Sequence, residues 1–261
     1  MGYIIAVLNN KGGVGKTTIT CNLADGLGKK HKSVLVVDLD PQCNASKMLL
    51  NTNTHIRKSI YEVLDPDESN DLSGCFYPTT CKNVSMIPNI SETGGLEPDI
   101  INNAPDSFFQ LRNKIRDKAI DEFDYTLIDC PPNMGSFVLC ALYTSDFAIV
   151  PIKAGSVFSI EGLIKASNLI SEVRKKGNPD MRFLRLLINA VDKRTSISKS
   201  VISQLHAIFN KDQVFETKIP VNTTFELAES GNKTVFQQDP SSTGARAFRS
   251  LTKEVISILE G

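Results

Sequence analysis

A glycine- and lysine-rich stretch near the start of the chain carries the clearest chemistry, because its residue types are those that bind phosphate. Residues 8–18 read LNNKGGVGKTT. The three glycines let the backbone curl so that successive N–H groups converge, and a helix that begins near Lys16 adds the positive end of its dipole. In this arrangement Lys16 reaches the outer phosphates of a nucleotide and the Thr17 hydroxyl binds Mg²⁺. The residues predicted to contact the nucleotide here are Gly12, Gly13, Val14, Gly15, Lys16, Thr17 and Thr18.

One position of this stretch departs from the common phosphate-loop pattern G-x-x-x-x-G-K-[ST]. Where that pattern has its first glycine the chain has Asn10, and a second lysine, Lys11, follows it. The surroundings still fit a phosphate loop, because residues 3–8 form an apolar run typical of a buried strand and residues 17–27 carry apolar residues at helical spacing. We therefore favour nucleotide binding over a glycine-rich turn that holds no ligand.

Carboxylates follow two other apolar runs of the chain. Asp38 and Asp40 follow one run, and Asp129 follows the other. Ligands of an open parallel sheet lie outside the carboxyl ends of its strands, so these side chains and Lys16 are expected to meet at one phosphate chain. Asp129 is placed as a Walker-B carboxylate, which holds Mg²⁺ directly or through a water molecule. The alternative is an aspartate that only caps its strand.

The two aspartates after the first run are expected to have different roles, one in metal binding and one in orienting water. Asp38 and Asp40 are two residues apart, so a still-extended backbone places both side chains on one face. One of them can enter the metal shell, and the other can orient water in line with the γ-phosphorus, where positioning supplies most of the catalysis. We assign the attacking water to Asp40. The predicted metal ligands are Thr17, Asp38 and Asp129, and the predicted catalytic residues include Lys16 and Asp40.

These residues need a scaffold that brings several strand ends to one edge, and the alternation of apolar runs with amphipathic segments predicts one. We expect an α/β fold, a single P-loop NTPase domain over residues 1–261 with a mostly parallel sheet of about seven strands and helices on both faces. Residues 65–80 are rich in turn formers and are expected to be surface loop. The strands are expected at residues 3–8, 34–37, 84–88, 125–128, 147–152, 183–191 and 214–219. The main helices are expected at residues 17–27, 45–50, 107–123, 137–143, 160–176, 196–209, 222–229 and 244–259.

Composition limits the function classes. The chain has 29 basic and 29 acidic residues, so no global field draws it to nucleic acid or to an anionic membrane, and such binding needs a local patch. Its six cysteines form no C-x-x-C pair, which predicts a reduced cytoplasmic protein with plain thiols. No segment approaches the roughly 18 consecutive apolar residues of a membrane span, and the first apolar run is too short for a signal peptide.

Several motifs together resemble the ParA/Soj branch of the ParA/MinD deviant-Walker ATPases over nearly the whole chain. They are KGGVGKTT, DLDPQCN, DYTLIDCPPNMG, VDKRT, IP-N and GNKTVFQQDPSSTGARAF. The resemblance implies ATP and Mg²⁺ as cofactors, an ATP-dependent homodimer that sandwiches its nucleotides, and slow hydrolysis that a ParB-like partner stimulates. It also implies that Lys11 is the signature lysine, which reaches the phosphates of the partner subunit and takes part in catalysis.

The same resemblance assigns adenine contacts and a second ligand. Asn189 and the Pro220 backbone are the implied adenine contacts, although a strand-end asparagine that satisfies backbone groups is an equally open interpretation of Asn189. Relatives bind DNA nonspecifically and move plasmids, chromosome origins or other cargo over the nucleoid. This chain has Val221 and Thr224 where the family often has arginines. The remaining candidates for a local basic face are Lys193, Arg194, Lys199, Lys218, Lys233, Arg246 and Arg249.

Three alternatives stay open beside a partitioning ATPase. A MinD-like membrane regulator would need a detachable amphipathic anchor, whereas the last helix, FRSLTKEVISILEG, looks integral to the fold. A metallocluster reductase of the nitrogenase iron-protein type would need cysteines that bridge a dimer, and Cys130 is the candidate. An ATP-dependent small-molecule ligase of the same superfamily would not need Lys11. We therefore expect a cytoplasmic, nucleoid-associated ATPase without a membrane partner.

Overall fold

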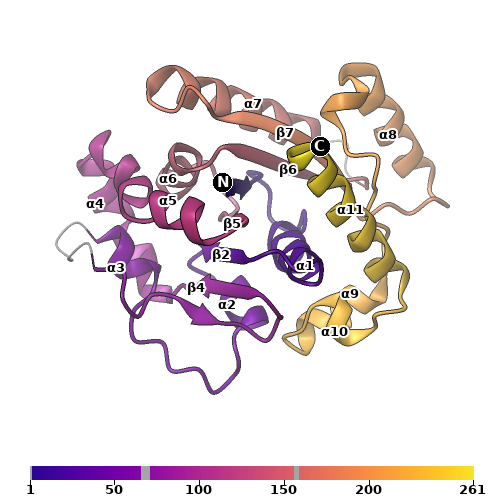
Figure 1. Cartoon of the computed structure of the whole chain (residues 1–261). Helices are drawn as coiled ribbons and strands as arrows, with labels where there is room; N and C mark the ends of the chain where they lie inside the picture. The colour runs from indigo at the N-terminus through magenta and orange to yellow at the C-terminus, as the bar shows by residue number, and fades with distance from the viewer. Residues whose placement is uncertain (1, 66–70, 156–158) are drawn as a thin grey trace.

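The sheet at the centre of the molecule gathers strands from all along the chain (Figure 1). The structure is a computed structural model that describes residues 2–65, 71–155 and 159–261. Its seven strands follow the order β3-β4-β2-β5-β1-β6-β7, and all neighbours pair in parallel except β3, which runs antiparallel to β4. The expected α/β fold with a mostly parallel sheet is confirmed. The strands are β1 (Tyr3–Val7), β2 (Val34–Asp38), β3 (Tyr77–Pro78), β4 (Val84–Ile87), β5 (Tyr125–Asp129), β6 (Phe147–Lys153) and β7 (Arg182–Asn189).

Helices cover both faces of the sheet, because side chains of each strand alternate between two apolar cores. In β1, Ile4 and Ala6 point into the first core, while Ile5 and Val7 point into the second. Helices α3 to α8 complete the first core, and α1, α2, α10 and α11 complete the second. The helices are α1 (Lys16–Gly28), α2 (Asn44–Leu49), α3 (Ile60–Leu64), α4 (Glu97–Asn102), α5 (Gln110–Glu122), α6 (Ser136–Thr144), α7 (Ser159–Lys176), α8 (Ser196–Ile208), α9 (Thr223–Ser230), α10 (Val235–Gln238) and α11 (Thr243–Glu260).

The seventh strand is not the one that the sequence predicts. The segment expected as a strand at residues 214–219 makes one isolated bridge to β7, from Val214 to Leu186, and a second bridge joins the next residue, Pro220, to Val191 beyond the end of β7; no continuous ladder forms. Between these bridges the N–H groups of Glu216 and Thr217 donate to the two carboxylate oxygens of Glu254 in α11, at 2.7 and 2.9 Å. A side chain therefore takes the donors that a strand would use.

The strand that replaces it lies within the expected surface loop. Residues 66–70 of that loop lie outside the described residues, but β3 near its end pairs with β4, Tyr77 opposite Met86. The Tyr77 hydroxyl also accepts the N–H of Arg57 at 2.8 Å. Local composition predicts a loop here, and long-range pairing with an existing sheet edge adds the short strand.

The C-terminal helix is built into the second core. Phe248, Leu251 and Val255 of α11 are buried against α1 and the sheet. The last turn is held by the hydroxyl of Tyr125, which donates to Glu260 Oε1 at 2.6 Å. No helix in the described part of the chain is long and apolar enough to cross a membrane.

The parallel pairing brings the predicted site residues to one edge. In register, Val7 lies opposite Asp129, and Asp38 lies opposite Asp129 on the other side of β5. Strand β1 lies between β5 and β6, and eight residues separate the end of β1 from the start of α1 at Lys16. In α/β sheets this edge is where ligands bind.

Candidate functional site

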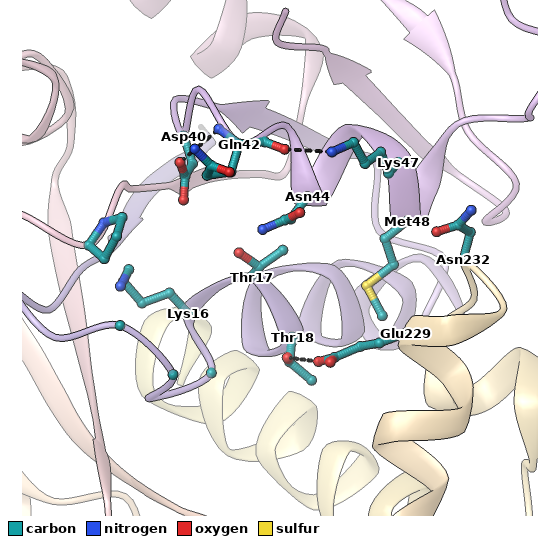
Figure 2. Close-up of a pocket in the computed structure, with 14 residues that line it drawn as sticks. Lys16, Thr17, Thr18, Asp40, Gln42, Asn44, Lys47, Met48, Glu229 and Asn232 are labelled. Atoms are coloured by element: carbon teal, nitrogen blue, oxygen red, sulfur yellow. Dashed lines mark hydrogen bonds between the residues drawn. The ribbon is translucent and has the colours of Figure 1, made fainter. Parts of the chain in front are cut away.

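A cavity of about 400 Å³ opens at the start of α1, beside the loop that follows β1 (Figure 2). One wall is the glycine-rich loop with the first turn of α1. The second wall is the loop after β2 together with α2, and the third is the end of α9 with the turn after it. The lining residues are Gly12, Gly13, Gly15, Lys16, Thr17, Thr18, Asp40, Gln42, Asn44, Lys47, Met48, Pro132, Glu229 and Asn232.

The glycine-rich loop has the curled backbone that its sequence predicts. Gly13 and Gly15 have φ angles of 72° and 93°, in the left-handed region that L side chains rarely adopt. Lys16 is buried, and its Nζ donates to the backbone oxygen of Lys11 at 3.0 Å. Burial lowers the pKa of Lys16, while Asp129, Cys130 and Asp40 raise it. The loop therefore curls over its own lysine in the way that a phosphate cradle requires.

Thr17 and Asp129, assigned by sequence to one metal site, are in direct contact. The Thr17 hydroxyl donates to Asp129 Oδ2 at 2.7 Å, and the Thr20 hydroxyl donates to Asp129 Oδ1 at 3.2 Å. Asp129 is fully buried, and burial followed by the charge of Asp38 raises its pKa well above the ordinary value. The Thr17 hydroxyl and the Asp129 carboxylate, whose negative charge is not fully balanced by a nearby cation, offer the oxygen ligands that Mg²⁺ prefers. The contact supports the predicted metal site, and the individual ligands remain a prediction.

Asp38 is engaged differently from Asp129. Its Oδ1 accepts the N–H of Asp40 at 3.1 Å, and its Oδ2 accepts the N–H and the hydroxyl of Ser46 at 2.8 and 2.7 Å. Burial raises the pKa of Asp38 to about 6, against the lowering effect of the Ser46 bonds. Both oxygens thus hold the turn after β2 against α2. A direct metal bond from Asp38 would compete with these bonds.

Of the three predicted aspartates, Asp40 is the one that lines the cavity (Figure 2). Its Oδ1 accepts the N–H of Gln42 at 3.0 Å, and Lys47 closes the same loop by donating to the Gln42 backbone oxygen at 2.9 Å. The loop presents the Asp40 carboxylate toward Lys16 across the cavity (Figure 2). This is the placement that a water-orienting residue needs.

The predicted adenine contacts lie beside the loop, outside this cavity's lining. Asn189 at the end of β7 donates from Nδ2 to the Val14 backbone oxygen at 2.7 Å, and its Oδ1 accepts the Ala190 N–H at 2.8 Å. Pro220 pairs with Val191 in an isolated bridge next to that strand end. In this structure Asn189 supports the backbone of the loop, which is the open alternative of the sequence interpretation, and its contact with adenine stays a prediction.

Sequence reasoning missed part of the cavity wall. Gln42 and Asn44 lie within the DLDPQCN motif and Pro132 within DCPPNMG, so the motifs already marked their positions. Asn232 lies within GNKTVFQQDPSSTGARAF, whereas Glu229, near the end of α9, lies outside every quoted motif and is more than 200 residues from the glycine-rich loop. Tertiary packing places them there.

Two of the predicted basic residues, Arg194 and Arg249, lie in different surroundings. Arg194 is held by Asp192 through two bonds, Nε to Oδ1 at 3.0 Å and Nη2 to Oδ2 at 2.9 Å, which lower the Asp192 pKa to about 2. Arg249 instead lies 5.7 Å from the centre of the Phe236 ring, and Lys29 lies at the same distance from that ring. Lys29, just after the end of α1, and Arg249 of α11 therefore both lie over the Phe236 ring, and exposed Arg246 precedes Arg249 by about one turn of α11.

The cysteines lie apart from any metal-binding arrangement. All six are free and buried. Within residues 2–65, 71–155 and 159–261, no group of three His, Cys, Asp or Glu side chains is placed to hold a metal ion. Mg²⁺ in phosphoryl-transfer sites needs only one or two protein ligands, because phosphate and water supply the rest.

Comparison with known sequences supports this chemistry. The AAA domain family matches residues 2–183. The chain is 35% identical over 256 residues to the sporulation initiation inhibitor protein Soj of Bacillus subtilis, with 98% of both chains covered. It is 33% identical over 256 residues to the chromosome partitioning protein ParA of Myxococcus xanthus, with 98% of this chain and 88% of the relative covered.

Solved structures share the same architecture. A structure described as cobyrinic acid a,c-diamide synthase from Mycobacterium smegmatis, with bound ADP and magnesium, matches with a TM-score of 0.83 and 27% identity over 100% of this chain and 96% of that one. The septum site-determining protein MinD of Pyrococcus horikoshii, complexed with Mg-ADP, matches with a TM-score of 0.78 and 22% identity, over 98% of this chain and 96% of that one. The second likeness concerns the fold alone.

Proposed function

This chain belongs to the ParA/Soj branch of the ParA/MinD family of P-loop ATPases, and we propose that it segregates DNA or positions other cargo through ATP-controlled association. ATP and Mg²⁺ are its cofactors, as the nucleotide-bound similar structures support. The finer proposal has four parts, which are a nucleotide-sandwich homodimer, nonspecific DNA binding, slow hydrolysis that a ParB-like partner stimulates, and association with the nucleoid.

The observation that carries the ATPase mechanism is the convergence of Lys16, the Thr17–Asp129 pair and Asp40 around one cavity. Lys16 binds the outer phosphates of the nucleotide, and the backbone N–H groups of the loop bind its other phosphates. Thr17 and Asp129 hold Mg²⁺, which neutralises negative charge on the phosphate oxygens when it is bound. Asp40 orients the attacking water.

Lys11 couples this site to a second copy of the chain. Its backbone already contacts Lys16, and its position ahead of the paired glycines leaves the side chain on the loop rather than in the helix. We assign the Lys11 side chain to the phosphates of the partner's nucleotide, where a second cation stabilises charge that develops during phosphoryl transfer. Dimerisation and hydrolysis would then depend on the same residue.

The proposed DNA surface centres on the basic residues near Phe236. Arg246 and Arg249 are exposed on α11 and donate to the backbone oxygens of Ser241 and Pro240, whereas Arg194 is paired with the charged carboxylate of Asp192. The double variant Arg246→Ala/Arg249→Ala should weaken binding to nonspecific duplex DNA about tenfold and flatten its salt dependence, with Arg194→Ala as the matched control. Unchanged DNA binding in the double variant would place the DNA surface away from α11.

A DNA-binding assay with ATP, ADP and no nucleotide is the experiment that tests the proposed function as a whole. A partitioning ATPase should bind nonspecific DNA with ATP and lose that binding steeply with salt. Absence of a shift at low salt with ATP would instead favour the ATP-dependent small-molecule class. The MinD-like alternative is less supported, because the apolar face of α11 is buried in the second core.

A further inference from the structure

An acidic side chain lies in a cavity that is otherwise suited to phosphate. Glu229, near the end of α9, lines the cavity, and its Oε1 accepts the hydroxyl of Thr18 at 2.5 Å (Figure 2). Thr18 directly follows the magnesium threonine in the first turn of α1. Phosphate oxygens and carboxylate oxygens are both acceptors, so a bound nucleotide and Glu229 compete for the same hydroxyl proton. Their negative charges also repel each other.

Helix α9 is lightly anchored apart from this bond. Ala228 is the buried residue of this fully described helix, and Leu227 is 59% exposed. Phe225 packs edge-to-face on Phe248 of α11, with ring centres 5.8 Å apart, and Asn222 caps the first turn through a 2.9 Å bond from the Thr224 N–H. The start of α9 is therefore held by packing, and near its end the bond between Thr18 of α1 and Glu229 adds to the packing of buried Ala228.

The chain beyond α9 is fixed firmly to α1. Asn22 Oδ1 accepts the N–H of Val235 at 2.7 Å, and the Thr234 hydroxyl donates to the carboxylate of Asp25. Both α1 side chains are fully buried. Asn232, with a φ of 50°, lies in the short turn between α9 and this anchor. The turn is bonded back to α9, because the N–H groups of Asn232 and Lys233 donate to the backbone oxygens of Glu229 and Ala228 at 3.1 and 2.9 Å. Movement of the end of α9 would therefore carry this turn with it, as far as the anchor at Thr234.

We propose that Glu229 is a positioning residue that nucleotide displaces. Without nucleotide, its bond to Thr18 holds the end of α9 at the rim of the cavity. Bound nucleotide takes the Thr18 hydroxyl and repels the carboxylate, so that α9 is released together with the exposed Leu227 side chain. Nucleotide binding in the cavity thereby changes the outer surface of α9. The mechanism requires nucleotide binding but neither dimerisation nor DNA binding, so it can fail while the proposed function holds.

Hydrogen exchange measured by mass spectrometry on the full chain, with and without ADP and Mg²⁺, tests the proposal. In the wild type, exchange in residues 223–230 should rise several-fold on addition of nucleotide. In Glu229→Ala it should be fast from the start and unchanged by nucleotide, and the Kd for Mg-ADP should tighten about fivefold, because removal of one exposed like charge is worth a factor of this order. Glu226→Ala, which removes an exposed carboxylate from the same helix, should behave as the wild type.

Two further variants separate charge from contact. Glu229→Gln keeps an acceptor for Thr18 and removes the charge, so nucleotide affinity should still tighten while α9 stays protected in its absence. Thr18→Ala should expose α9 without nucleotide as Glu229→Ala does. The proposal is overturned if Glu229→Ala weakens Mg-ADP binding, which would make Glu229 a nucleotide ligand, or if nucleotide leaves α9 exchange in the wild type unchanged or slows it.

Discussion

At the scale of single residues, three aspartates that follow apolar strands have three different surroundings. Asp129 is fully buried against two threonine hydroxyls, and Asp38 is fully buried against the start of α2. Asp40 alone of the three lines the cavity, and a backbone N–H two residues on fixes its carboxylate. All three side chains are carboxylates, so the packing around each one decides whether its oxygens can reach a reacting group.

The Asp40→Ala variant should therefore lose turnover and keep its ligand. Removal of the group that orients water should lower the rate of phosphate release by about 100-fold or more, while Mg-ATP still binds and still produces dimers. Sedimentation velocity and phosphate release on one sample check both halves. Asp117→Ala, at an exposed position of α5, is the matched control, and a purely monomeric Asp40→Ala protein in saturating Mg-ATP would remove the assignment.

The buried thiols make a second residue-scale prediction. Burial and the nearby Asp38 raise the pKa of Cys43 to about 11, and burial raises the pKa of Cys81 to about 12. Because the thiolate is the reactive form, both cysteines should stay largely unmodified by iodoacetamide at pH 8 in the folded protein. Intact-mass spectrometry should show alkylation of all six cysteines only after unfolding in guanidinium. Rapid modification of Cys43 in the folded chain would contradict its buried setting.

At the scale of elements, the phosphate loop depends on a strand that is distant in sequence. A Cβ atom added to Gly15 would lie 2.3 Å from Asn189 Nδ2, so the end of β7 and the loop fit only without a side chain at that position. The bond from Asn189 to the Val14 oxygen fixes the same contact from the other side. Loop conformation is therefore set jointly by β1, α1 and β7.

Asn189→Ala tests whether this support matters without nucleotide. Loss of the bond to Val14 should lower the free energy of unfolding of the nucleotide-free protein by about 1 kcal/mol, because a buried carbonyl oxygen loses its donor. Urea denaturation with and without Mg-ADP measures the effect. If stability changes only when nucleotide is present, Asn189 acts as a base contact and not as a support of the loop.

Sequence patterns predict those elements whose signal is local, and they fail where a distant side chain decides. The glycines of the phosphate loop and the apolar runs of β1, β2 and β5 are recognisable from their own residues, so the sheet and the loop could be predicted from the sequence. The expected strand at residues 214–219 fails because the carboxylate of Glu254 takes two of its N–H donors. Glu229 was missed for the same reason, because its role depends on Thr18, 211 positions earlier.

At the scale of the whole molecule, one loop is expected to serve two active sites. Within one chain the loop binds its own nucleotide through Lys16, which is buried and bonded to the backbone oxygen of Lys11. The side chain of Lys11 is only partly buried, and we propose that it reaches the phosphates of the partner's nucleotide. In this proposal Lys16 serves nucleotide binding and Lys11 serves dimer formation.

Lys11→Ala is expected to separate the same two events in solution. Mg-ATP should bind the variant within a few-fold of the wild-type affinity, because Lys16 and the loop N–H groups remain. ATP-dependent dimers should be lost in sedimentation velocity, since two stacked nucleotides would face each other without the cation that offsets their charge. Lys30→Ala, which removes an exposed lysine beyond the end of α1, controls for a general change of charge. A dimer of unchanged stability in Lys11→Ala would mean that this lysine acts only within its own chain, and the shared-site mechanism would have to be abandoned.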